Sequence, residues 1–154
     1  GAALVKDYER RIEQVKQAAA EFEHRPRVYF EEWDEPMISA IRWVSELVNI
    51  AGGQDCFAEL GLMPLGKDRI IAASTRVISA DPQIIIGSWC GKKFRPEKVS
   101  SRAGWDVIDA VRHGRLFEIK SPNILQPGPA ALTDGLDQLH QIMLDFNQNP
   151  LPVV

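Results

Sequence analysis

The sequence predicts an α/β fold: one Rossmann-like lobe with a mainly parallel central sheet flanked by helices, preceded by a long helix. Short β-type runs alternate with helical stretches along the chain, as expected for such a fold. The run Gln83–Gly87 contains three consecutive isoleucines, which is typical of a strand buried on both faces of a parallel sheet. Apolar residues near the start recur every three or four positions and indicate an amphipathic helix. The 154 residues suffice for one domain with a core of its own.

The first half of the chain is expected to supply two helices and the first strand. One face of the first helix carries Leu4, Tyr8, Ile12, Val15, Ala19 and Phe22. Pro26 ends that helix, and Arg27–Glu31 has the composition of a short strand. After a loop, Pro36 is expected to open a second helix that reaches residue 51, where Gly52 and Gly53 end it. Residues 54–69 are expected to be irregular.

The second half is expected to alternate in the same way. A short helix is predicted near residues 74–79, and Pro96 opens another. Residues 105–113 form a helix that ends at Gly114, and Leu116–Ile119 form a strand. Pro129 then opens a last helix over residues 129–146. We therefore divide the chain into a leading helix (1–25), an α/β lobe (26–148) and a tail (149–154).

Composition excludes several classes of protein. The formal net charge is −3, with 18 Lys and Arg against 21 Asp and Glu, so no basic stripe indicates a nucleic-acid partner. No apolar run is long enough to span a membrane, and the first residues lack the layout of a signal peptide. Cys56 and Cys90 are expected to be free thiols, although a single bridge between them remains open. The three histidines are too dispersed to predict a metal site.

Candidate ligand contacts follow from the position of three loops. Ligands of open α/β sheets bind beyond the carboxyl ends of the strands, and loops 31–36, 87–96 and 120–129 leave such ends. They supply six candidate ligand-binding residues: Trp33, Asp34, Trp89, Cys90, Asn123 and Gln126. Flat indole surface suits a large apolar ligand. Trp89, between Ser88 and Cys90, is expected to lack local cover and so to face a ligand, whereas Trp33 either folds back onto the lobe or contacts the ligand.

Charged and nucleophilic residues in these loops leave alternatives open. Lys92, Lys93 and Arg95 form either an anion-binding cluster or a solvated basic turn. No glycine-rich phosphate loop or serine nucleophile motif occurs, so we expect no enzymatic activity. The alternative is a small α/β enzyme domain that uses Cys90 or the neighbouring carboxylates of Asp34 and Glu35.

Three segments resemble bacterial cobalamin-binding (vitamin B12) substrate-binding proteins of ABC importers: Ile84–Val99, Val28–Pro36 and Ile124–Leu136. A further pattern, Gly104-Trp105 followed by Ala110-Val111 and Gly114-Arg115-Leu116, is similar to iron-siderophore, haem and cobalamin binders more widely. The resemblance implies a periplasmic protein of two α/β lobes, joined by one long helix, that delivers ligand to a membrane permease without catalysis. This chain resembles that helix and the C-terminal lobe, with the N-terminal lobe missing.

The resemblance also implies roles and departures at single positions. The ligand implied is cobalamin or a related corrinoid, with an iron siderophore or haem as the alternative. Gln126 stands where the enterobacterial cobalamin binder has an arginine, and Arg69 where it has a tryptophan. Thr75 replaces a glutamate that usually pairs with permease arginines. Because the missing lobe would leave the apolar face of residues 4–22 partly uncovered, we expect this helix to associate with a second copy or to pack on its own lobe.

Overall fold

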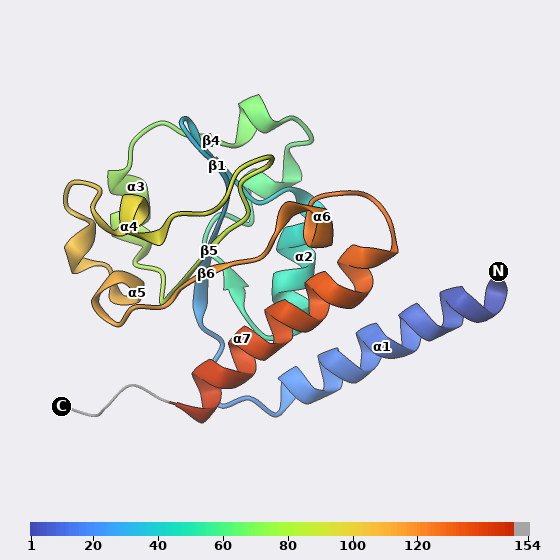
Figure 1. Ribbon diagram of the computed structural model, residues 1–154. Coiled ribbons are helices and arrows are strands. Elements are labelled where there is room, and N and C mark those ends of the chain that lie inside the picture. Colours follow the sequence, from blue (N-terminus) through green and yellow to red (C-terminus); the bar gives the residue numbers. More distant parts are fainter. Residues whose placement is uncertain (150–154) are drawn as a thin grey trace.

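The computed structural model describes residues 1–149 and shows a mixed sheet between two layers of helices, which confirms the predicted α/β class (Figure 1). The sheet order is β4-β2-β1-β5-β6, with β3 also paired to β1. β1 (Arg27–Asp34), β5 (Ile84–Gly87) and β6 (Leu116–Glu118) run parallel, as does the short β3 (Gln54–Asp55). β2 (Met37–Ser39) and β4 (Ile70–Ile71) add an antiparallel edge.

Alternate side chains of the central strands pack into two separate cores. Val28 and Phe30 of β1 face one core, together with Ile84 and Ile86 of β5. This core is covered by α1 (Ala2–Ala20), α2 (Arg42–Ala51), the π-helical segment η4 (Ala131–Gly135) and α7 (Leu136–Gln148). Ile85 is fully buried in the opposite core. Both faces of β5 are therefore covered, as its continuous apolar run predicts.

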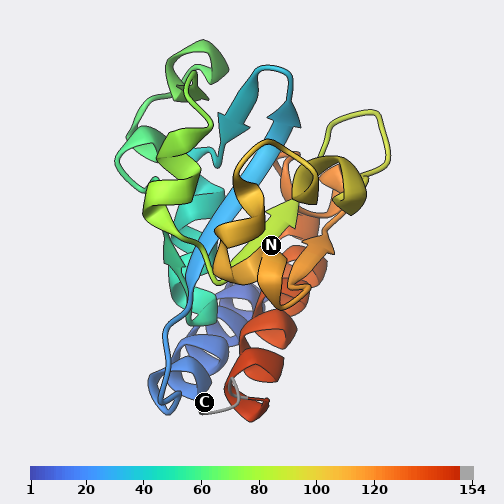
Figure 2. The ribbon, with the colours of Figure 1, turned by 90° about the vertical axis from the view of Figure 1, so that its left-hand side faces the viewer.

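Short helices cover the second core (Figure 2). They are α3 (Thr75–Ala80), α4 (Pro96–Ser100), η3 (Trp105–Val107) and α5 (Asp109–Arg112). Trp105 is fully buried there, as expected, while Trp43 on α2 is only partly buried and packs against the first core. Two short 3-10 turns, η1 (Leu60–Leu62) and η2 (Gly66–Arg69), and the one-turn helix α6 (Ser121–Ile124) complete the described elements.

The prediction that Pro36 opens a helix is wrong. Pro36 lies in a hairpin turn, with Asp34 paired to Met37 across it, and β1 extends through the residues predicted as a loop. Helix α2 begins only at Arg42. The N–H of the preceding residue, Ile41, donates a hydrogen bond to the carboxylate of Glu32. The sequence did not show this because the group that satisfies the backbone at this helix start lies nine residues upstream.

The long helix α1 lies along α7 and α2 on its own lobe (Figure 1). Val15 and Ala19 are buried, and Arg11 forms an ion pair with Asp137 of α7. The first turns are different: Leu4 and Val5 are 51% and 54% exposed. The helix thus packs on its own lobe over its second half, while association through residues 4–22 stays a prediction. No helix of residues 1–149 combines the length and apolarity needed to cross a membrane, and most of the predicted tail, 150–154, lies outside the described residues.

Candidate functional site

The carboxyl ends of β1, β5 and β6 meet at one edge of the sheet, because the three strands are parallel and neighbouring (Figure 2). Glu31 is level with Gly87, and Gly87 with Glu118. A hollow of about 530 Å³ lies beyond this edge, within the volume range of small-molecule sites. It is lined by Trp89, Cys90, Gly91, Lys92, Lys93, Glu118, Lys120, Ser121, Pro122 and Gln126.

Trp33, at the end of β1, and Trp89, after β5, both lie close to one ammonium group. The Lys92 Nζ lies 4.3 Å from the centroid of the Trp33 ring and 5.0 Å from that of Trp89. It also lies 2.7 Å from Oδ1 of Asp34. Partial burial acts to raise the pKa of Asp34, but the hydrogen bond from Lys92 and its charge outweigh burial and leave the pKa below its ordinary value. Trp33, Asp34 and Trp89 thus come together around Lys92, although Trp33 and Asp34 lie in β1 and not in a loop.

The prediction that Trp89 lacks local cover is wrong. Its side chain is only 3% exposed, because Phe94 packs edge-on against it at a centroid distance of 5.0 Å and Lys92 lies over its ring. The Phe94 ring occupies the space that a Cβ at position 87 would need, so glycine at the end of β5 is what admits this cover. Trp89 therefore forms the floor of the hollow, whereas Trp33 is half-buried.

Glu31 is a fully buried carboxylate that directly follows the apolar and aromatic residues of β1. Glu31 Oε1 lies 2.9 Å from Arg102 Nη1 and accepts a hydrogen bond of 3.1 Å from the Tyr29 hydroxyl. The Trp89 indole N–H is also near this carboxylate, although no hydrogen bond of ordinary geometry joins them. Burial raises the pKa of Glu31 more than Arg102 lowers it. Burial, helped by the negative charge of Glu31, likewise raises the pKa of Tyr29 well above 10.

A second buried ion pair joins β1 to η2, which precedes the antiparallel strand β4. Arg69 Nη1 lies 2.9 Å from Oε2 of Glu32 and donates to the Ser39 carbonyl oxygen at 2.6 Å. Burial raises the pKa of Glu32, and the charge of Arg69 offsets this only in part. Arg69, at the position where the resemblance puts a tryptophan, is therefore buried beside β1 and β2. The ion pairs Glu31–Arg102 and Glu32–Arg69 could not be predicted from the sequence, because the partners lie 71 and 37 residues apart along the chain.

The remaining candidate ligand-binding residues do not all line the hollow. Cys90 is exposed and lines the hollow with Gln126, whereas the half-buried Asn123 is not among the residues that line it. Both cysteines are free, and burial raises the pKa of Cys56 to about 12. Glu35 is exposed in the hairpin turn. Among the described residues, no group of three acidic, cysteine or histidine side chains is arranged to hold a metal ion.

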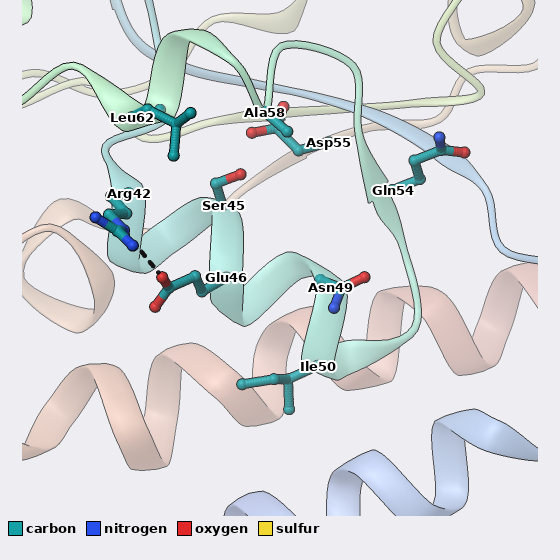
Figure 3. A pocket seen from close by; sticks show the side chains of 10 residues that line it. Arg42, Ser45, Glu46, Asn49, Ile50, Gln54, Asp55, Ala58 and Leu62 are labelled. Atoms are coloured by element: carbon teal, nitrogen blue, oxygen red, sulfur yellow. Dashed lines mark hydrogen bonds and ion pairs between the residues drawn. The ribbon is translucent and has the colours of Figure 1, made fainter.

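A second hollow, of about 510 Å³, lies on the flank between α2 and the β3–η1 segment (Figure 3). Its lining includes the polar residues Ser45, Glu46 and the buried Asp55. Burial raises the pKa of Asp55, while a hydrogen bond from Ser45 opposes the rise. This hollow runs along α2 from Arg42 to Ile50 and shares no lining residue with the first hollow. The sequence analysis assigned it no role.

The sequence profile of the periplasmic binding protein family matches residues 1–122 of the chain, about four fifths of its length. The chain belongs to the periplasmic binding protein family. Family membership implies an extracytoplasmic location. A search of curated protein sequences found no match.

Solved structures share the fold of this periplasmic binding protein. An ABC transporter substrate-binding protein of Listeria monocytogenes aligns with a TM-score of 0.76 at 21% identity, over 94% of this chain and 57% of that one. The periplasmic vitamin B12 binding protein of Vibrio cholerae aligns at 0.69 and 18% identity, over 94% and 53%. A periplasmic haem-binding protein of Roseiflexus sp. RS-1 aligns at 0.69 and 22% identity, over 93% and 56%. The chain thus spans little more than half the length of these proteins.

Proposed function

We propose that the chain is the C-terminal lobe of a two-lobed substrate-binding protein, which captures cobalamin or a related corrinoid for an ABC importer. The observation that carries the proposal is the hollow at the carboxyl ends of β1, β5 and β6, with the Trp89 indole in its floor. The vitamin B12 binding protein among the similar structures supports the choice of ligand. Haem or an iron siderophore is the alternative, favoured by the similar haem-binding structure.

The proposed site is one half of a cleft. Its hollow is open and bounded by a single lobe, so a corrin-sized ligand would keep much of its surface in water. The single lobe is therefore expected to bind weakly, and a second lobe placed over the same edge to tighten binding sharply. The helix α1 would join the two lobes, and a membrane permease would receive the ligand. We infer binding without turnover, because the chain belongs to a family of binding proteins.

Titration of purified protein with cyanocobalamin, haemin and a ferric hydroxamate tests the proposal. Two forms are compared: this chain, and the protein of the complete reading frame. We expect saturable binding of cyanocobalamin that is much tighter in the longer form, with the ligand recovered unchanged. Trp89→Ala in the longer form should weaken binding by about 1–3 kcal/mol, because the indole lines the hollow. Leu62→Ala, on the flank of the lobe, is the matched control and should bind as the parent does. Absence of binding of all three ligands would contradict the proposal.

A further inference from the structure

The acidic residues at the carboxyl end of β1 are all neutralised within the lobe. Glu31 is paired with Arg102, Glu32 with Arg69, and Asp34 with Lys92. The first two carboxylates are buried or nearly so, and the side chain of Asp34 is only 10% exposed. These carboxylates are therefore not available to attract a cation from solution.

The lysines around the hollow are not neutralised in the same way. Lys92, Lys93 and Lys120 line it, and Glu118 is the one carboxylate that lines it with them. Glu118 Oε2 accepts a hydrogen bond of 2.9 Å from the Phe94 N–H. Within residues 1–149, neither Lys93 nor Lys120 forms an ion pair. The chain as a whole carries a formal charge of −3, so this accumulation of ammonium groups is local.

We propose that Lys93 and Lys120 bind an anionic group, a carboxylate or a phosphate, carried by the ligand of this hollow. This assignment rests on the proposed function. The two residues reach the hollow from the loops that follow β5 and β6, so an anion between them would be contacted from two strand ends. Lys92 has a different role: its ammonium is held by Asp34 and both indoles, and it fixes the floor on which the apolar part of the ligand rests.

Electrostatics at the hollow is tested without any ligand, because the chain carries a reporter there. Cys90 is exposed in the hollow, whereas the pKa of about 12 keeps Cys56 almost entirely protonated near pH 8. We compare the reaction of Cys90 with a dianionic aromatic disulfide, 5,5′-dithiobis(2-nitrobenzoate), and with a neutral one, 4,4′-dithiodipyridine. At low salt, the double variant Lys93→Ala/Lys120→Ala should react about five-fold more slowly with the dianion, and the effect should vanish in high salt.

Two controls define the result. The neutral disulfide should react at the same rate with parent and double variant, which separates charge from access to the thiol. Lys67→Ala removes a lysine from η2, next to the antiparallel edge strand β4, and should leave both rates unchanged. Equal rates of the dianionic reagent with parent and double variant would overturn the inference.

Paired ligands then identify the anion. Haemin is compared with its dimethyl ester, which lacks free carboxylates, and cyanocobalamin with dicyanocobinamide, which lacks the phosphodiester. For the pair that binds, the member that carries free carboxylates or the phosphodiester should bind about ten-fold more tightly, and the double variant should lose that difference. Equal affinity within a binding pair would overturn the anion assignment and leave the proposed function intact. If no member of either pair binds, the proposed capture of a tetrapyrrole fails, and the inference that rests on it fails as well.

Discussion

The two halves of strand β1 differ sharply in chemistry although both lie in the same sheet. Val28, Tyr29 and Phe30 are apolar or aromatic, fully buried, and divided between the two cores. The next four residues contain three carboxylates, each paired with a cation from a distant segment. The first half joins the sheet to the helix layers. The second half ties three loops to the edge of the sheet where the hollow lies.

The comparison shows how charged residues at the end of a strand can hold neighbouring segments in place. Apolar burial is non-directional and tolerates many arrangements, whereas a buried carboxylate is stable only with a cation and hydrogen bonds in defined places. Arg102 follows α4, Arg69 ends η2, and Lys92 follows β5. The carboxylates therefore help to specify the positions of these three segments.

Phe30→Ala is expected to have the largest effect and tests the apolar half. Phe30 is fully buried in the first core, so its truncation should lower the free energy of unfolding by about 3–5 kcal/mol. Phe117→Ala on β6, where the ring is 36% exposed, is the matched control and should lose far less. Urea unfolding followed by circular dichroism measures both. Similar losses for the two variants would contradict the assignment of Phe30 to the core.

Arg102→Leu tests the charged half and should lower the free energy of unfolding by about 3 kcal/mol near neutral pH, since it leaves Glu31 buried without its cation. The pKa of Glu31 is raised by burial in the folded protein, and losing Arg102 raises it further. The folded state then binds a proton that the unfolded state releases, so stability increases as pH falls from the raised pKa toward the unfolded value of about 4.3.

The loss caused by Arg102→Leu should therefore be smaller at pH 5 than at pH 8 in urea unfolding. The double variant Glu31→Gln/Arg102→Leu removes the titrating carboxyl, so its stability relative to the parent should show less of this pH dependence. A loss that is equal at both pH values in Arg102→Leu would show that Glu31 does not carry the effect.

Lys92→Ala tests the last ion pair of the charged half of β1, between Lys92 and Asp34. The ammonium is partly exposed, so its ion pair and contacts with two indoles together should stabilise the fold by about 1–2 kcal/mol. Lys92→Arg should retain most of this. Thermal unfolding gives the stability, and tryptophan emission should shift to longer wavelength in the alanine variant as the Trp89 ring gains contact with water. An unshifted spectrum would indicate that Lys92 does not cover the indole.

Leu4→Ser/Val5→Ser should have the smallest effect on stability, below about 0.5 kcal/mol, because both side chains are mostly exposed. If the first turns of α1 mediate association, the same substitution should shift sedimentation at high protein concentration toward the monomer. Lys6→Ala, in the same turn, serves as the control. A parent protein that is monomeric at all concentrations would exclude association through residues 4–22.

Elements with local signals could be predicted from the amino-acid sequence. The isoleucine run of β5, the amphipathic pattern of α1 and the start of α4 at Pro96 each follow from neighbouring residues, and the structure confirms them. The rule that ligands bind at the carboxyl ends of parallel strands was enough to predict that Trp33 and Trp89 lie at the same end of the sheet. Both contact Lys92 there.

Which of these residues are covered, and which charges are neutralised, depends on contacts between segments far apart along the chain. Pro36 lies in a hairpin rather than a helix because Met37–Ser39 pair with the end of β1. Trp89 is buried because Phe94 folds back over Gly87. The partners of Glu31 and Glu32 lie 71 and 37 residues away along the chain. Local composition carries no information about such distances, because the gain from an ion pair or an aromatic contact depends on atoms that only the folded chain brings together.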